Sequence, residues 1–336
     1  MTPKRLREIT SRYRRVRVVL VGDVALDRYL HIDPSLQETS LETRLPVHNV
    51  VKVRPQPGGG GNVLANLAAL RPEKVIAVGF CGQDGEGLEL RRSLEALGVD
   101  LSLFITTPRR MTFTYTKPLL IRPGRPPEEL SRLDIRSRTP TDAALQAAII
   151  RHLCAAAAKA DVIVAMDQVP EPRNGVLTRR VKNALMKLAR RRPRKVFLAD
   201  SRTSIGDFRD VRIKVNRAEL LRHFGAGDEA DIQALALRWS NDIGRDVFVT
   251  LGERGILAAS GGVVRHVPGI RVEPPIDIVG AGDTVLAHVA MALGAGASAV
   301  EAAELGCLAA GVVIKKIGTT GTASAKELAA ALKRVS

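Results

Sequence analysis

Short, nearly continuous apolar runs recur along the chain, and each ends in or is followed by Gly, Asp or Asn. These runs cover residues 16–21, 75–82, 161–166, 195–200, 211–216 and 246–252. Such runs are typical of parallel strands that are buried on both faces of a sheet. Segments with apolar residues at helical spacing separate them, at 62–70, 86–98, 141–160, 178–192 and 228–244. This alternation predicts an open, doubly wound α/β sheet, in which ligands bind beyond the carboxyl ends of the strands.

Two regions interrupt this alternation. Residues 28–54 contain short candidate strands, and residues 109–122 alternate between polar and apolar side chains with period two. A small extra sheet inserted into an α/β domain often forms a lid or a contact between subunits. We therefore expect a single domain over residues 1–336 with lid segments at approximately 28–56 and 109–122. A surface hairpin without function is the alternative.

The composition fits a folded, soluble protein of the cytoplasm. Hydrophobic residues make up 45% of the chain, which is enough for a large core. The three cysteines form no Cys-x-x-Cys pair, which suits a reducing compartment better than disulfides or a zinc site. The apolar stretch 285–317 contains Glu301 and Glu304, so we expect no membrane span there.

The chain is strongly basic, with a formal net charge of +16. Such a charge suits nucleic acid, anionic metabolites or an acidic surface, and an arginine-rich solvated surface explains it equally well. The basic runs at 4–17 and 189–195 contain a single tyrosine between them, which is little for base stacking. We therefore expect no nucleic-acid partner.

The stretch DIVGAGDTVLAHVAMALG at 277–294 places an acid at the start of an apolar helix. Gly280, Ala281 and Gly282 precede Asp283, and the unpaired N–H groups of a helix N-terminus carry partial positive charge. Glycines let a phosphate approach these groups closely. Asp283 could simply cap the helix. The functional interpretation is that Asp283 takes a proton from an attacking hydroxyl while the N–H groups stabilise the phosphate charge.

A second glycine-rich stretch, PGGGGNVLANLAAL at 57–70, precedes another predicted helix. Four consecutive glycines let the backbone approach a polar ligand, and a turn alone rarely needs so many. The dipeptide Gly-Lys occurs nowhere in the chain, so this stretch is not a P-loop. It also lacks the G-x-G-x-x-G form after a strand, so a dinucleotide site is poorly supported.

These motifs and two others resemble those of the ribokinase, or PfkB, family of sugar and nucleoside kinases. DIVGAGDT is similar to the family signature Asp-x-Thr-Gly-Ala-Gly-Asp-Thr, and Gly58 to Asn62, followed by GQDGEG, is similar to its early glycine motif. NRAE matches Asn-x-x-Glu, and VTLGERG matches Thr-x-Gly-x-x-Gly. The order and spacing agree over residues 16–330. The resemblance implies a ribokinase-like, mostly parallel sheet with a small inserted β lid.

The resemblance also implies roles for single positions. Asp283 is similar to the catalytic base of the family, and the N–H groups of Gly280, Ala281 and Gly282 resemble its anion hole. The positions that resemble sugar-binding residues are Asp27, Gly59, Gly60 and Asn62. Those that resemble nucleotide-binding residues are Lys214, Asn216, Thr250, Gly252 and Gly255. Asn216 and Glu219 look like a pair that organises Mg²⁺ largely through water, and Asp277 lies where the family often places a monovalent cation such as K⁺.

The implied activity is the ATP- and Mg²⁺-dependent phosphorylation of a hydroxyl on a sugar or sugar phosphate. One alternative is a nucleoside kinase on the same scaffold, and another is a non-catalytic regulator that binds a sugar or nucleotide. The presence of Asp283, Asn216 and Glu219 argues against the regulator. The resemblance also implies a homodimer formed through the lid.

Within the family, the segments GDVALDRYL, ETSLETRLPV and LSRLDIR resemble those of kinases that act on heptose 7-phosphate. The chain departs from the usual pattern at Val279, where threonine is common, at Arg202, where lysine is common, and in the loops 167–175 and 199–204. No His-x-Gly-His occurs, so we do not expect the nucleotidyltransferase domain that is sometimes fused to these kinases. The surplus arginine suits a phosphorylated sugar, but the sequence alone does not locate the arginines involved.

Overall fold

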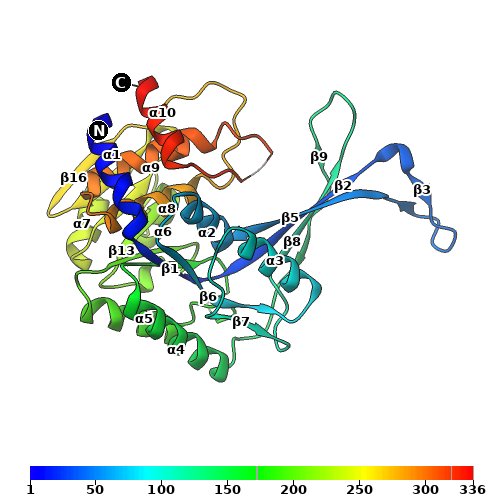
Figure 1. Cartoon of the computed structure of the whole chain (residues 1–336), viewed down its shortest axis with the longest axis horizontal. Coiled ribbons are helices and arrows are strands. Elements are labelled where there is room, and N and C mark those ends of the chain that lie inside the picture. Colours follow the sequence, from blue (N-terminus) through cyan, green and yellow to red (C-terminus); the bar gives the residue numbers. More distant parts are fainter. Residues whose placement is uncertain (172, 319, 336) are drawn as a thin grey trace.

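The structure, a computed structural model, describes residues 1–171, 173–318 and 320–335. Within these residues, a nine-stranded sheet in which most neighbours run parallel lies at the centre (Figure 1). Its strands, in their order across the sheet, are β16 (Val263–Val267), β15 (Ile256–Ser260), β14 (Val247–Thr250), β13 (Arg212–Asn216), β12 (Val196–Ser201), β11 (Val162–Asp167), β1 (Arg17–Gly22), β6 (Lys74–Gly82) and β7 (Phe104–Thr107).

The six predicted strands are all present in this sheet, as β1, β6, β11, β12, β13 and β14. β1 pairs in parallel with β6 and β11, and parallel pairing continues through β12, β13 and β14. Most of their residues are buried, as continuous apolar runs require. Because the strands are parallel, their carboxyl ends lie at one edge of the sheet, and the polar residues that follow them gather there.

The sequence does not predict β7, β15 or β16. β15 and β16 form an antiparallel hairpin at the edge of the sheet, and the left-handed residues Gly261 and Gly262 make the turn. β16 is largely exposed, so it lacks the apolar run of a central strand. β7 has only four residues and pairs with β6 alone.

Helices cover both faces of the central sheet. One face is packed by α1 (Pro3–Arg12), α2 (Gly60–Ala69), α8 (Ala281–Gly294), α9 (Ala299–Val313) and α10 (Ala325–Val335), with α3 (Gly85–Ala96) beside β6. The other face is packed by α4 (Ala143–Lys159), α5 (Arg179–Arg191), α6 (Arg217–Phe224) and α7 (Ile232–Ile243). Short 3₁₀ turns occur at Tyr13–Arg15, Pro34–Leu36, Ile205–Asp207 and Gly252–Arg254. Among the described residues, no helix has the length and apolar character needed to cross a membrane.

The five helices predicted between the strands correspond to α2, α3, α4, α5 and α7, and the apolar helix predicted after Gly280, Ala281 and Gly282 is α8. The largest difference in a boundary is at α7, which begins at Ile232 because the Asp231 carboxylate accepts N–H bonds from the next turn and caps the helix. The sequence does not predict α6, which begins directly after Asn216. Asn216 and Glu219 form a capping box there, so the Asn-x-x-Glu motif marks a helix N-terminus.

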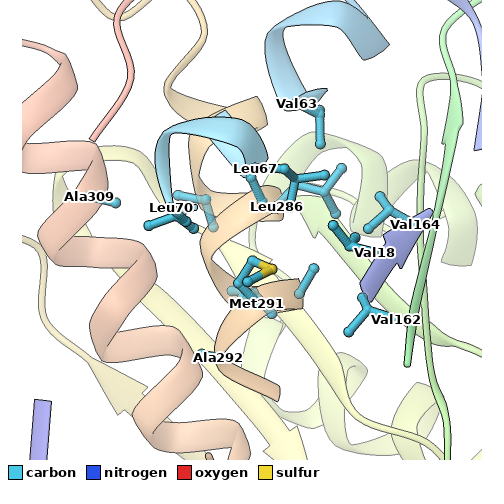
Figure 2. Packing of buried hydrophobic residues seen from close by; sticks show 14 of the residues in the cluster. Val18, Val63, Leu67, Leu70, Val162, Val164, Leu286, Met291, Ala292 and Ala309 are labelled. Carbon is cyan, nitrogen blue, oxygen red and sulfur yellow. The ribbon is translucent and has the colours of Figure 1, made fainter. Parts of the chain in front are cut away.

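The helix α8 is packed between α2, α9 and the central sheet. Figure 2 shows Val63 of α2, Leu286 of α8 and Val164 of β11 in one buried layer. All three side chains are fully buried. Because such an interior is close-packed, α8 and Asp283 in its first turn are held in a fixed position relative to the strand ends.

A second, smaller sheet extends from the main body as an arm (Figure 1). Its strands, in order, are β10 (Leu133–Ile135), β8 (Thr114–Leu120), β2 (Val24–Ile32) and β5 (Val50–Gly59), with β9 (Glu128–Glu129) paired to β8. β3 (Glu38–Thr39) and β4 (Pro46–Val47) form a short hairpin in the connection between β2 and β5. Residues 28–56 and 114–122 lie in this arm and its connections. Residues 109–113, the predicted start of the second lid segment, precede β8 and are bonded to the main body through Arg110 and Thr112. β2 follows β1 almost directly, so the arm begins at the carboxyl end of a central strand.

Candidate active site

The carboxyl ends of the central strands and the base of the arm enclose a cavity of about 460 Å³. Both glycine-rich motifs reach it, through Gly59 and Asn62 on one side and Gly280 and Asp283 on the other. The remaining lining residues are Asp23, Ala25, Asp27, Phe113, Tyr115, Lys117, Glu129, Arg132, Arg136, Gln168, Val169, Asp200, Arg202, Lys214, Glu219 and Val279. The cavity lies where the doubly wound sheet predicts a ligand site.

Asp283 stands in the first turn of α8. There the Ala281 N–H donates to the Ile278 carbonyl at 3.2 Å, and the Gly282 N–H has no backbone partner among the described residues. Gly280 is the N-cap, adopts a left-handed conformation (φ 80°) and offers no side-chain cap. The Asn62 amide donates a hydrogen bond of 3.2 Å to Asp283 Oδ2. Burial raises the pKa of the Asp283 carboxyl to about 6, although the nearby Lys214 opposes this shift. A carboxylate poised near neutral pH is suited to act as a general base.

Lys214 forms a buried ion pair with Asp200 in the same cavity. The ammonium lies 2.6 Å from Asp200 Oδ2, and both side chains are at most 8% exposed. Burial alone would lower the pKa of Lys214, but the carboxylates around it, Asp200 above all, raise it above its ordinary value. A Cβ on Gly282 would lie only 3.4 Å from Lys214 Nζ. A permanent positive charge therefore adjoins the N-terminus of α8.

Asn216 and Glu219 are joined by two hydrogen bonds at the start of α6. The Asn216 N–H donates to Glu219 Oε2 at 2.8 Å, and the Glu219 N–H donates to Asn216 Oδ1 at 2.8 Å. Glu219 lines the cavity, and burial together with the charge of Asp200 raises its pKa. Mg²⁺ usually keeps several waters and binds through one or two carboxylates and substrate phosphates. The oxygens of Glu219 and Asp200 fit such an ion.

Asp27, the predicted sugar-binding acid, is paired with a lysine that the sequence analysis missed. Lys117 Nζ lies 3.2 Å from Asp27 Oδ2 and 3.3 Å from the Tyr29 hydroxyl. Gly58 allows the Asp27 carboxylate to approach, since a Cβ there would come within 2.8 Å of it. A ligand hydroxyl that reaches Asp27 would therefore meet a neutral ion pair. The period-two pattern, which puts Tyr115 and Lys117 on one face of β8, is a signal that could have revealed this lysine.

Arg132, Arg136 and Arg202 concentrate positive charge on the cavity wall. Arg132 Nε and Arg136 Nη2 lie 2.6 and 2.7 Å from the two oxygens of Asp134. Their guanidinium carbons lie 4.9 and 5.6 Å from the centre of the Tyr115 ring. One acid and one ring thus orient two arginines. The spacing of Arg132, Asp134 and Arg136 places them on one face of a strand, which is the sequence signal for this cluster.

Asp23 holds the loop that follows β11 against the cavity. Its carboxylate accepts backbone N–H bonds from Gln168 (2.9 Å), Val169 (3.2 Å) and Val176 (2.7 Å). Burial and the negative charge of Asp167 raise the pKa of Asp23. The loop 167–175 is therefore fixed at both ends by one buried acid, and Pro172 within it lies outside the described residues.

Several predicted site residues do not line the cavity around Asp283. Thr250 sits opposite Asn216 in the β13–β14 pair, and its hydroxyl donates to the Val215 carbonyl at 3.3 Å. Gly252, two residues later, begins the 3₁₀ turn Gly252–Arg254. Gly255 packs against the backbone of 267–269, which leaves no room for a side chain. The other predicted site residues outside the lining are Gly60, Ala281, Gly282, Asn216 and Asp277.

Asp277 organises the loop that precedes α8. Its Oδ1 accepts the Val279 N–H at 3.0 Å, and its Oδ2 accepts the Gly318 N–H at 3.2 Å. The Asp277 N–H in turn donates to the Ile314 carbonyl at 2.8 Å. Val279, which stands where threonine is common, is 54% exposed at the cavity mouth. The loop before α8 is thus joined directly by hydrogen bonds to the end of α9 and to the loop that follows it.

Residues 140–326, more than half of the chain, match the model of the pfkB family carbohydrate kinases. The chain belongs to this family, as the motifs around Asp283 and Asn62 indicate.

Similar proteins include the bifunctional protein HldE of Azorhizobium caulinodans, which is 35% identical over 322 residues. The match covers 94% of this chain and 64% of that relative. The bifunctional protein HldE of Pseudomonas aeruginosa is also 35% identical, over 96% of this chain and 65% of its own length. The chain thus spans slightly less than two thirds of these relatives.

Solved structures of low sequence identity share the fold. Ribokinase of Arabidopsis thaliana, solved with ribose and ATP, superposes with a TM-score of 0.66 at 20% identity over 95% of this chain and 99% of that one. Phosphofructokinase-2 of Escherichia coli, solved with potassium, gives a TM-score of 0.71 at 16% identity over 95% and 99% of the two chains. These similarities confirm the predicted ribokinase-like α/β fold.

Proposed function

We propose that this protein transfers the γ-phosphoryl group of ATP to a hydroxyl of a sugar that already carries a phosphate. The observation that supports this proposal most directly is one cavity lined both by Asp283, at the open N-terminus of α8, and by the cluster of Arg132, Arg136 and Arg202. The first feature suits proton removal and phosphoryl transfer. The second suits a phosphate that does not react, because guanidinium groups bind phosphate oxygens in pairs.

In the proposed reaction, Asp283 accepts the proton of the substrate hydroxyl as its oxygen attacks the γ-phosphorus and ADP leaves. Asn62 orients the Asp283 carboxylate, because its amide donates to Oδ2 and leaves Oδ1 for the substrate. The N–H groups of Gly280 and Gly282 would stabilise the negative charge on the phosphoryl oxygens. The Ala281 N–H, which the sequence also suggested for this role, donates instead to the Ile278 carbonyl at 3.2 Å. Lys214 adds a fixed positive charge beside them.

The same proposal assigns the bound ions. Asn216 and Glu219, with the charge of Asp200 acting on Glu219, would hold Mg²⁺ largely through water, and the ion would neutralise the phosphates of ATP. We assign Thr250, Gly252 and Gly255 to the nucleotide side and Asp277 to a K⁺ site. Asp27, Gly59, Gly60 and Asn62 would face the sugar. Heptose 7-phosphate is the first substrate to test, because the segments containing Asp27 and Arg132 resemble those of heptose 7-phosphate kinases.

The proposal is tested with a panel of sugars, sugar phosphates and nucleosides, each with ATP and Mg²⁺ and with ADP release as the measurement. We expect turnover on a sugar phosphate, heptose 7-phosphate included, with kcat/KM at least about tenfold above that for the same sugar without phosphate. Preference for a nucleoside would establish the rival kinase. ATP binding without turnover on any acceptor would favour the non-catalytic regulator.

A substitution on the arginine cluster tests where the phosphate group of the substrate binds. We expect Arg136→Gln to raise KM for the sugar phosphate about tenfold or more and to change kcat little, since the arginine binds a group that does not react. Arg125→Gln is the matched control, because Arg125 is exposed on the same segment and does not line the cavity. An equal effect of both variants would contradict this assignment.

We also propose that the arm pairs two copies of the chain. Exposed apolar side chains gather on β5 and on the connection to it, at Val50, Val51, Val53, Leu41 and Leu45. Val51 and Val53 share one face of the strand and are 57% and 43% exposed. Apolar side chains grouped in this way are typical of a surface that a partner covers.

A further inference from the structure

A second hollow, of about 940 Å³, lies on the flank of the molecule against the first turns of α5. Among the residues that the structure describes, its lining shares none with the cavity around Asp283. The lining residues are Pro140, Thr141, Gln146, Arg173, Thr178, Arg179, Arg180, Lys182, Asn183, Met186 and Asp207. The proposed kinase reaction gives this hollow no role.

The hollow is strongly positive. Among the described residues, the lining contains Arg173, Arg179, Arg180 and Lys182 and one acid, Asp207, which gives it a net charge of +3. Lys182 is also paired with Asp167, which lies outside the lining. Within the described part of the chain, no acid pairs with any of the three arginines. Unpaired arginines grouped around a concave surface attract anions.

The N-terminus of α5 adds further donors to this wall. α5 has 13 residues, and the Thr178 side chain at its N-cap accepts no hydrogen bond from the helix. The Thr178 hydroxyl instead donates to Gln146 Oε1 at 3.0 Å. The N–H groups of the first turn therefore keep their partial positive charge for a ligand.

Lys182 connects the hollow to the candidate active site. Its side chain is only 2% exposed, and its ammonium lies 3.2 Å from Asp207 Oδ2 and 2.9 Å from Asp167 Oδ2. Asp167, at the end of β11, also accepts hydrogen bonds from Ser201 (2.8 Å) and Ser204 (2.6 Å). These serines flank the turn that carries Arg202 into the cavity. One buried ammonium thus contacts the flank hollow and the acid that fixes this turn.

We propose that the flank hollow is a regulatory site for a small, multiply charged anion that carries phosphate groups. The arginines and the first turn of α5 would bind the phosphate oxygens, as helix N-termini do elsewhere. A bound anion would compete with Asp207 for Lys182 and so change how firmly Lys182 and Asp167 hold the Arg202 turn. The size of the hollow accommodates two or more phosphate groups.

The binding claim is tested by calorimetric titration of the full chain with inorganic pyrophosphate at constant ionic strength. The double variant Arg179→Gln/Arg180→Gln should weaken one binding event at least tenfold. The matched control is Lys187→Gln/Arg191→Gln, which removes the same charge from exposed positions farther along α5 and should leave that event unchanged within about twofold. Pyrophosphate binding at the cavity around Asp283 would persist in both variants.

Two results would overturn the proposal. The first is the same binding isotherm for the wild type and for Arg179→Gln/Arg180→Gln. The second is an equal loss of pyrophosphate affinity in the matched control, which would show that the attraction is non-specific. Neither result depends on kinase activity, so a failure of the proposed reaction would be recognised separately.

Hydrogen exchange tests the connection to the active site. Pyrophosphate should change amide exchange at residues 200–207 in the wild type and in the matched control, but not in Arg179→Gln/Arg180→Gln. A change of equal size in all three proteins would place its cause in the cavity around Asp283, and no change in any of them would remove the link through Lys182.

Discussion

Asp283, the proposed general base, is a half-buried acid whose ionisation also affects stability. Its pKa of about 6 lies above its ordinary value of 3.8 because the surrounding protein disfavours the charged form. Above pH 6 the ionised carboxylate therefore lowers the free energy of unfolding by its full amount, and below pH 4 this destabilisation is absent.

Asp283→Asn is expected to lower kcat by at least about 10² because the general base is lost. The same change should raise the free energy of unfolding at pH 8 by about 2 kcal/mol, after a discount for the contact of Asp283 with cavity water. The gain should vanish near pH 4. Turnover assays and denaturant titrations at both pH values measure these effects. Near-normal turnover in the variant would exclude Asp283 as the base.

The pH profile of kcat/KM offers an independent check of the same residue. The base must be ionised to accept a proton, so activity should fall tenfold for each pH unit below about 6. Burial is the main cause of the shift, so added salt should move this limb little. If kcat/KM instead began to fall only near pH 4, the Asp283 carboxylate would be solvated in the free enzyme.

At the scale of elements, the Lys182–Asp167 pair joins α5 to the ends of β11 and β12. The side chains are 2% and 5% exposed, so neither charge is solvated if the other is removed. A buried ion pair adds little stability compared with an apolar contact of the same size. Its main effect here is therefore to fix the geometry of the strand ends.

Lys182→Met is expected to lower the free energy of unfolding by about 3 kcal/mol, because Asp167 loses its cation while it stays buried. The double variant Lys182→Met/Asp167→Asn should recover part of this loss. Lys187→Met on the exposed face of the same helix is the control and should change stability by less than about 0.5 kcal/mol. Denaturant unfolding measures all three, and equal values for Lys182→Met and Lys187→Met would contradict a buried pair.

At the scale of the whole molecule, the arm is the surface that we propose to pair two copies of the chain. Val51→Glu/Val53→Glu places two charges on the apolar face of β5 and should shift the protein from dimer to monomer at micromolar concentration. Sedimentation equilibrium measures this change. Val263→Glu is the control, since Val263 is 46% exposed on β16 at the far edge of the central sheet. A wild-type protein that is monomeric at every concentration would refute the proposed pairing.

The sequence predicts much of this architecture because its signals are local. The six apolar runs predict the parallel strands, since a strand buried on both faces has no polar alternation. The glycines before Asn62 and Asp283 are a second local signal. They predict places where the backbone approaches a ligand closely, since a side chain there would block the approach, and in both cases a helix begins at these glycines. The exposed strand β16 lacks such a signal and is missed. The short helix α6 is missed although its capping box, Asn216 and Glu219, is a sequence signal for a helix N-terminus.

The sequence by itself thus determined the α/β sheet, the family and the acid at the start of α8, because each depends on residues that are neighbours in the chain. Only the tertiary structure decided that Lys117 neutralises Asp27, that Lys214 pairs with Asp200, and that three arginines line the same cavity as Asp283. These side chains come from strands and loops far apart in sequence. Their contacts depend on the sheet order and the position of the arm, which no local pattern encodes.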